Sequence, residues 1–182
     1  MDTLSKIWKA IWGFVLRLFG LDKDETPLPK KSFNNKVYMA FLEEQIALGS
    51  SVEMRLIGFS MRPFLRNGKD DIVLSPMEGV TLRKGMVVLF RSHGTHILHR
   101  VRRVEKNGRL VIKGDGNYRK TEYATTRDVV AWVSRVIPNG RGRGFAYGSL
   151  RWHLRSAWSL TVKVVLNFGR DIKYGLKRKL KL

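Results

Sequence analysis

Residues 51–64 read SVEMRLIGFSMRPF, and this stretch decides how the rest of the chain is interpreted. From Val52 to Ile57 the side chains alternate with a period of two, which is typical of a β-strand. Gly58 and Ser60 follow the alternation at once. We therefore expect Ser60 to lie on a loop that the end of a strand holds in place.

The stretch is followed by a series of short apolar or alternating runs that Gly, Asn and Pro turns separate. These runs cover residues 72–74, 86–90, 96–104, 109–113 and 129–136. Short strands at such spacing predict a mainly β core. Before them, apolar residues recur at helical spacing over residues 33–46, between the candidate N-cap Ser32 and a stop at Gly49. This pattern predicts one helix.

Three sequence blocks contain the residue types of a serine hydrolase. They read GFSMRPF at 58–64, ILHRV at 97–101 and KGDGN at 113–117. A serine hydroxyl such as that of Ser60 needs a base to take its proton, and the base needs a third group to fix its tautomer. The imidazole of His99 suits the first task because its ordinary pKa of about 6.5 leaves a neutral form at pH 7. Asp115 is a candidate for the second task.

Each block also has a plainer interpretation. Serine before Met-x-Pro is common in turns, a histidine such as His99 often lies half-buried in a strand, and Asp115 between two glycines suits a hairpin turn. The other histidines are weaker candidates for a base. His93 and His96 flank a glycine in a predicted hairpin tip, and His153 lies in a basic, aromatic segment.

In order and spacing, the three blocks resemble the signal peptidase and S24/S26 serine peptidase family. Many members use a lysine base, so His99 places the resemblance with the Ser-His branch, typified by the signal peptidases of archaea and the endoplasmic reticulum. The resemblance covers roughly residues 52–138 and implies a signal-peptidase/LexA-like coiled β fold. It implies that Ser60 is the nucleophile, His99 the base and Asp115 the supporting acid, with Glu122 as a second candidate for the acid.

The resemblance also gives roles to the loop around Ser60. Gly58, Phe59, Met61 and Pro63 would form the substrate and oxyanion loop, with Met61 packed beneath the site and Pro63 stiffening the loop. Many signal peptidases carry a hydroxyl residue two positions before the nucleophile, where this chain has Gly58. Oxyanion stabilisation would then rest on backbone N–H groups. Losing one donor costs about 10² to 10³ in rate, so an active but slow enzyme is compatible with this loop.

Composition limits the class of protein. A chain of 182 residues with 43% hydrophobic residues fits one domain with appendages. The absence of cysteine excludes disulfides, cysteine nucleophiles and thiolate metal sites. No metal or organic cofactor is suggested by the sequence. The 35 basic residues against 15 acidic ones give a formal charge of +20, which implies a polyanionic neighbour such as a lipid surface or nucleic acid.

The distribution of basic residues favours a lipid surface. Residues 1–21 predict an amphipathic helix with Lys and Arg opposite Trp, Phe and aliphatic side chains, which suits an in-plane membrane helix better than a span. Residues 22–31 predict a linker, residues 32–138 the peptidase domain and residues 139–182 a basic amphipathic segment. We expect peripheral attachment to an anionic surface of the bacterial cell membrane, with the membrane face and the oligomeric state left open.

Two other functional classes remain open. One is a peptidase-fold protein that has lost catalysis and binds peptide or lipid. The other is a LexA-like regulatory peptidase, which would need a helix-turn-helix domain, whereas only one plausible helix precedes the β region. The Gly- and Arg-rich residues 139–148 resemble a solvated loop, since an RNA-binding segment of this type would repeat more often. A peptide or precursor protein is therefore the expected substrate, and nucleic acid is not an expected partner.

Overall fold

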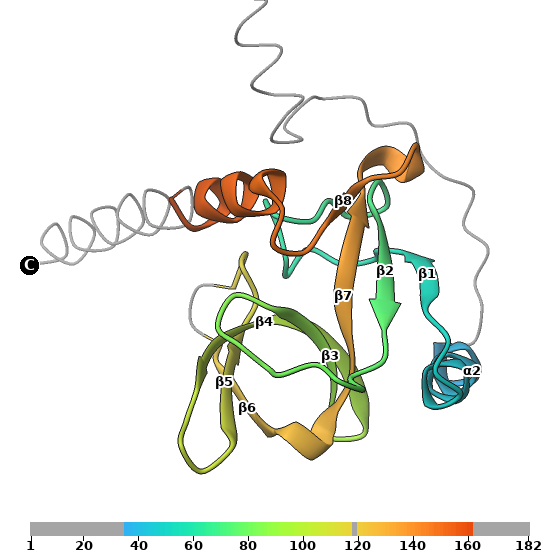
Figure 1. The fold of residues 1–182 in the computed structure, drawn as a ribbon, viewed down its shortest axis with the longest axis vertical. Coiled ribbons are helices and arrows are strands. Elements are labelled where there is room, and N and C mark those ends of the chain that lie inside the picture. The colour runs from blue at the N-terminus through green and yellow to red at the C-terminus, as the bar shows by residue number, and fades with distance from the viewer. Residues whose placement is uncertain (1–34, 118–119, 162–182) are drawn as a thin grey trace, which may run out of the picture.

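The computed structural model describes residues 35–117 and 120–161 of the chain (Figure 1). The elements in chain order are α2 (Asn35–Ala47), β1 (Val52–Arg55), β2 (Asp71–Ser75), β3 (Val87–Ser92), β4 (Thr95–Val104), β5 (Arg109–Lys113), β6 (Glu122–Thr125), a 3₁₀ turn (Thr126–Asp128), β7 (Val129–Ile137), a second 3₁₀ turn (Pro138–Gly140) and β8 (Phe145–Ala146). Residues 150–161 form a further helix. The predicted helix 1–21, the linker 22–31 and the N-cap Ser32 lie outside the described residues.

The described strands form one antiparallel sheet of eight strands, in the order β1-β2-β7-β3-β4-β5-β6, with β8 paired to β7. The protein is therefore mainly β, as the sequence predicts. β7 lies between β2 and β3, so the centre of the sheet joins segments that are far apart in the chain. β3 to β6 curl until β6 also contacts β3 (Figure 1).

Every run predicted as a strand contains one, but β6 and β8 are additional. β6 has four residues and buries Glu122 and Ala124 while exposing its other two. A charged residue on its buried face conceals the alternation that would have predicted it. β8 has only two residues, which is too short for any periodic pattern.

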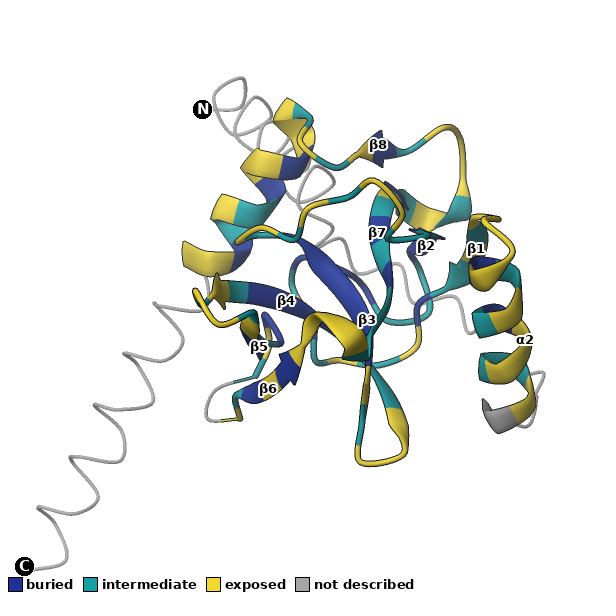
Figure 2. Ribbon diagram, turned by 60° about the horizontal axis from the view of Figure 1, so that its bottom comes forward, coloured by how far each residue is buried: buried dark blue, intermediate teal, exposed yellow. Residues whose placement is uncertain are grey.

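Buried apolar side chains form two clusters on opposite faces of the sheet. The larger packs α2, the Ser60 loop and the helix 150–161 against β1, β2 and β7. The smaller fills the inside of the curled β3–β6 region, and its members are Met86, Val88, Phe90, Val101, Leu110, Ile112 and Ala124. Figure 2 shows β3 as buried along most of its length. Val87 and Leu89 belong to the larger cluster and Val88 and Phe90 to the smaller, so β3 presents one face to each cluster.

The helix α2 buries a different face from the one that its apolar spacing suggests. Leu42 and Ile46, one turn apart, are 0% and 6% exposed. Val37 and Phe41, which the pattern places on the same face, are 67% and 52% exposed. The buried face of α2 packs against β1 and β7, and its other side faces solvent.

The core continues past Pro138, where the sequence suggests that the peptidase domain ends. Trp152 is 2% exposed and its ring lies 4.9 Å from that of Phe64 and 5.1 Å from that of Tyr147. Within the helix 150–161, Trp152 and Arg155 therefore face the core, although the sequence groups them with a membrane-binding segment. None of the helices in the described part of the chain is long and apolar enough to cross a membrane.

Candidate active site

Ser60 lies on a turn that begins just after β1. Gly58 has a φ of +126°, a conformation that glycine adopts without the penalty of a side chain, and its N–H donates to Asn67 Oδ1 at 2.8 Å. Beyond Ser60, the side chains of Met61 and Phe64 are buried and attach the turn to the larger apolar cluster. The turn is therefore held on both sides of the serine.

A cleft of about 640 Å³ opens beside Ser60, between α2, β1 and the β3–β4 hairpin. Most of its lining is apolar and consists of Met39, Met54, Leu56, Ile57, Met61, Ile72, Leu89, Ile97 and Leu98. β1 is the end strand of the sheet and pairs with β2 alone within the described residues. One edge of β1 therefore has backbone groups that no neighbouring strand uses.

His99 lies on β4 and is 4% exposed. Its Nδ1 lies 3.1 Å from Glu122 Oε2. The register of the sheet explains this pairing, because Val101 is opposite Ile112 on β5 and Ile112 is opposite Glu122 on β6. Residues opposite one another, and residues two apart on a strand, share a face. His99, Val101, Ile112 and Glu122 therefore all point into the curled part of the sheet.

The surroundings of His99 favour its neutral form. Burial lowers its pKa below the ordinary value of 6.5, and Glu122 opposes this shift, while Lys120 adds to it. The Lys120 ammonium lies 3.6 Å from Glu122 Oε1, an oxygen that is buried and accepts no hydrogen bond. A neutral ring that donates through Nδ1 to Glu122 keeps Nε2 as a proton acceptor.

Gly114 brings His99 Nε2 close to the Ser60 backbone. A Cβ atom at position 114 would lie 2.5 Å from the Ser60 carbonyl oxygen and 2.8 Å from His99 Nε2. The two atoms are therefore no farther apart than the sum of these distances. The Gly116 N–H donates to the same Ser60 carbonyl at 2.7 Å. Only residues without side chains at 114 and 116 permit this contact between the two loops.

Within the described residues, Ser60 Oγ makes no hydrogen bond to the His99 ring. The side-chain nitrogen of Asn117 lies 3.4 Å from Nε2 instead. Catalytic hydrogen bonds are often long without substrate and shorten in the complex. A structure without a hydrogen bond from Ser60 Oγ to His99 is therefore compatible with a nucleophile and its base. In the same part of the chain, the backbone N–H groups of Ser60 and Met61 donate no hydrogen bond. Both remain free to stabilise an oxyanion.

Asp115 faces a different set of partners. Its carboxylate accepts hydrogen bonds from Arg100 at 2.8–3.1 Å and from Arg102 at 2.8 Å. The hydroxyl of Ser159, in the helix 150–161, donates to it at 3.0 Å. The side chain of Asp115 is fully buried. Asp115 thus joins β4 to the helix 150–161.

The sequence-based choice of Asp115 as the partner of His99 is therefore corrected in favour of Glu122, the second candidate. Neighbouring residues of a strand point to opposite faces, so Arg100 and His99 cannot share one acid. Asp115 binds the arginine face of β4, and Glu122 binds the histidine face. The turn that carries Asp115 still contributes to the site, because its flanking glycines contact the Ser60 backbone.

Of the remaining loop residues, Ile57 lines the cleft and is 77% exposed. Phe59 is 62% exposed, and the Arg62 guanidinium lies 4.8 Å from the centre of its ring. Pro63 follows a cis peptide bond and is partly buried. Within this loop, Ile57 therefore adds an exposed apolar side chain to the cleft.

The other histidines do not replace His99. His93 has a positive φ of 49° in the turn between β3 and β4. His96 lines the cleft, but its Nε2 lies 2.6 Å from Glu43 Oε1, which also accepts from Arg91 Nε at 2.6 Å. His153 is exposed on the helix 150–161. These positions agree with their lower ranking as candidate bases.

Sequence reasoning missed Asn117 and the roles of Arg100 and Arg102. Asn117 belongs to the KGDGN block, and a polar side chain two residues after Asp115 was the available signal. The alternation of β4 contains the signal for the arginines, since positions 100 and 102 must face away from His99.

No group of three or more metal-ligating side chains of the kind His, Cys, Asp or Glu occurs in residues 35–117 and 120–161. Compared with known proteins, the chain matches no protein-family model and no curated sequence.

Proposed function

We propose that this protein is a membrane-associated serine endopeptidase of the signal-peptidase type. The observation that carries the proposal is the position of His99, which has Glu122 on one ring nitrogen and the Ser60 loop beside the other. The apolar cleft next to Ser60 adds a place for a substrate. The coiled antiparallel sheet supports a signal-peptidase/LexA-like fold.

The proposed reaction is acyl transfer in two steps. Ser60 Oγ attacks the carbonyl carbon of the peptide bond while its proton passes to His99 Nε2. Glu122 stabilises the imidazolium through the Nδ1–H bond. The same proton then passes to the leaving amine as the C–N bond breaks. Water, deprotonated by His99, attacks the acyl-enzyme and restores the Ser60 hydroxyl.

The developing oxyanion would be stabilised by backbone N–H groups of the Ser60 turn. The amides of Ser60 and Met61 are the candidates, because neither donates elsewhere in the described part of the chain. Gly58 supplies no side-chain hydroxyl as a further donor. We infer slow turnover, because a missing oxyanion donor costs about 10² to 10³ in rate.

The substrate would be an extended peptide. An unpaired strand edge accepts a peptide by adding a strand, and main-chain hydrogen bonds then supply affinity. The free edge of β1 lies along the cleft that contains Ser60. The apolar lining of the cleft would select apolar side chains next to the cleaved bond.

The proposed location is an anionic membrane surface. The predicted amphipathic segment 1–21 and the charge of +20 are the basis for this. In the helix 150–161, the outward-facing Leu150 and Leu154 are 75% and 49% exposed and add apolar surface. Vesicles with anionic lipid should bind the protein better than neutral vesicles, and salt should weaken this binding. Equal binding to both kinds of vesicle would contradict a peripheral, charge-dependent attachment.

A phosphonylating serine probe tests the proposed chemistry without a known substrate. We expect the probe to modify Ser60 of the intact protein, as located by peptide mass spectrometry. Ser60→Ala should abolish labelling, and His99→Ala should slow it by several orders of magnitude. Cleavage of a peptide library should fall as far in the double variant as in either single variant, because the two residues act as one unit. A folded protein that neither labels nor cleaves would instead be a peptide-binding module.

A further inference from the structure

A second, smaller cavity of about 140 Å³ lies between β4 and the helix 150–161. Its lining contains no Asp or Glu, and its polar members are Lys84, Arg100, Arg102, Tyr147, Trp152, His153 and Ser156. Its volume is well below the roughly 300 Å³ at which pockets for drug-sized ligands begin. The cavity therefore suits a small group and not a peptide or a nucleotide.

The polar side chains that line this cavity can all donate hydrogen bonds, and several of their donors have no partner within the described residues. Arg102 donates from Nη2 to Asp115, whereas its Nε is buried without an acceptor. The Ser156 hydroxyl accepts from Arg100 Nη1 at 3.2 Å, which leaves its own proton to donate. Lys84 is exposed and forms no ion pair within the described residues.

The local charge is also unbalanced. Arg100 and Arg102 share a single carboxylate, that of Asp115, and Lys84 adds a further positive charge. Burial lowers the pKa of the Arg102 guanidinium, Asp115 opposes this shift, and Arg100 adds to it. Excess positive charge beside donors without partners costs free energy unless an anion or water supplies acceptors.

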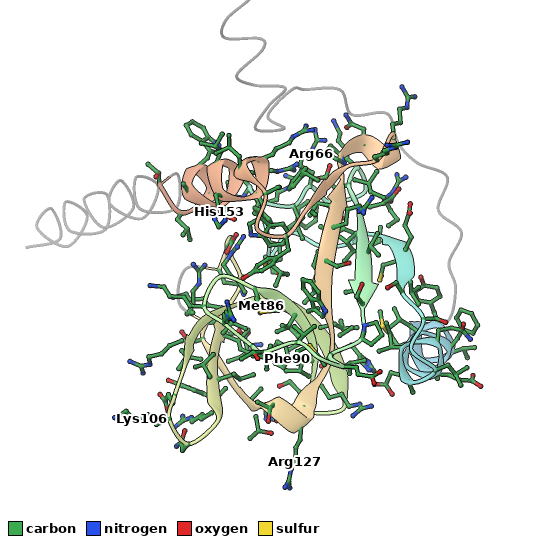
Figure 3. All side chains as sticks on the ribbon, viewed as in Figure 1. Arg66, Met86, Phe90, Lys106, Arg127 and His153 are labelled. Carbon is green, nitrogen blue, oxygen red and sulfur yellow. The ribbon has the colours of Figure 1, made fainter. Side chains whose placement is uncertain are left out.

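We propose that this cavity is a binding site for a phosphate group. Phosphate offers acceptor oxygens in several directions, which matches donors that come from a loop, a strand and a helix. Arg102 would bind it through Nη1, which makes no hydrogen bond within the described residues, Lys84 as a point charge and Ser156 through its hydroxyl proton. His153, labelled on the helix in Figure 3, lines the same cavity and would donate from its ring. The site is independent of the proposed peptidase activity and does not include Ser60 or His99.

The phosphate group can come from a soluble phosphate ester or from the headgroup of a membrane lipid. Both share the chemistry that the cavity recognises. The cavity lies beside the helix 150–161, which belongs to the basic segment 139–182 that the sequence assigns to the membrane surface. The experiments therefore test lipid headgroups separately from soluble phosphate.

The first experiment titrates the full-length protein with inorganic phosphate at constant ionic strength, using calorimetry and the NMR signals of the His153 ring. Saturable binding should weaken about tenfold or more in Lys84→Gln, as expected for the loss of a charge-assisted contact. Lys106→Gln removes the same charge at the β4–β5 turn, far from the helix 150–161 in Figure 3, and should bind phosphate like the original protein. Acetate should bind far more weakly.

A second variant guards against a misleading result. Arg102→Lys keeps the charge but removes the planar guanidinium donors, and it should also weaken phosphate binding while Asp115 retains a cationic partner. Equal weakening by Lys84→Gln and Lys106→Gln would overturn the proposal, because it would show general attraction to a basic protein. Equal affinity for acetate and phosphate would overturn it as well.

The second experiment decides the source of the phosphate. Vesicles of phosphatidylcholine with phosphatidic acid are compared with vesicles of phosphatidylcholine alone, using the original protein, Lys84→Gln and Lys106→Gln. A specific loss of binding to phosphatidic acid in Lys84→Gln identifies a lipid headgroup. Unchanged vesicle binding, together with weaker binding of inorganic phosphate, identifies a soluble phosphate.

Discussion

Replacing Glu122 with Gln should separate the two acids that follow His99 in the chain. Glu122 Oε2 lies 3.1 Å from Nδ1 of His99, and both side chains are almost completely buried. Glutamine keeps the shape but removes the charge, and its amide group can donate to Nδ1. Such a donor favours the tautomer with the proton on Nε2, which cannot accept a proton from Ser60.

The size of the effect follows from this geometry. At a separation near 3 Å and an effective dielectric constant of about 20, a carboxylate stabilises an imidazolium by roughly 5 kcal/mol. This corresponds to about 10³ to 10⁴ in rate. The cost of a wrong tautomer in a serine protease is also about 10⁴. We therefore expect Glu122→Gln to label at Ser60 about 10³ to 10⁴ times more slowly, with little change in the urea midpoint of unfolding.

Asp115→Asn is the matched comparison, since it makes the same chemical change on the opposite face of β4. It leaves Arg100 and Arg102 with no buried counter-charge, and breaking a buried ion pair costs about 3 to 5 kcal/mol of stability. We expect a lower urea midpoint, with labelling of the folded fraction retained within about tenfold. If Glu122→Gln labels normally and folded Asp115→Asn does not, the assignment of the acid is wrong.

Four further predictions concern other contacts. Because burial lowers the pKa of His99 below 6.5, the acid limb of Ser60 labelling should lie below pH 6.5, and a limb above pH 7 would contradict a buried neutral imidazole. Gly114→Ala should slow labelling by at least about 10², since its Cβ would meet both His99 Nε2 and the Ser60 carbonyl, and normal labelling would refute the close approach. Trp152→Ala should lower the free energy of unfolding by about 3 to 5 kcal/mol in urea titrations, whereas a change below 1 kcal/mol would place this side chain outside the core. Arg91 and His96 lower the pKa of Glu43 to about 2, so Glu43→Gln should lower the free energy of unfolding by about 1 kcal/mol above pH 4.5. This difference should shrink as the pH falls from 4.5 towards 2, because protonation removes the same charge from the original protein.

The mainly β class could be predicted because most strands carry their signal locally. The alternation from Val52 and the apolar runs at 72–74, 86–90 and 129–136 each fall within or across an observed strand. The pairing of β7 with both β2 and β3 could not be predicted, because no local pattern records which strands become neighbours. The same limit explains α2, whose inward face depends on where β1 and β7 lie.

The contact between His99 and an acid could not be predicted for a similar reason. Asp115 is the first choice from the sequence because of its place in the Gly-Asp block of the resemblance, whereas in the structure Glu122 contacts His99. The face of β4 to which each acid belongs depends on the register of β5 and β6 and on the bulge between Val101 and Arg103. Register is a property of the assembled sheet. Sequence could name both candidates but could not choose between them.

The dependence of the core on Trp152, Arg155 and Ser159 has a consequence for the timing of biosynthesis. These residues are made after every strand of the sheet, yet Trp152 packs on Phe64 in the Ser60 turn, and Ser159 donates to Asp115. A ribosome adds roughly 5 to 20 residues per second, and a domain folds as a unit once its parts are available. Ser60 of the nascent chain is therefore made seconds before the helix 150–161 that packs against its turn. A proteolytic activity at this site would begin only after the chain has been extended through residue 159, which keeps the newly made sheet from acting on the polypeptide to which it is still attached.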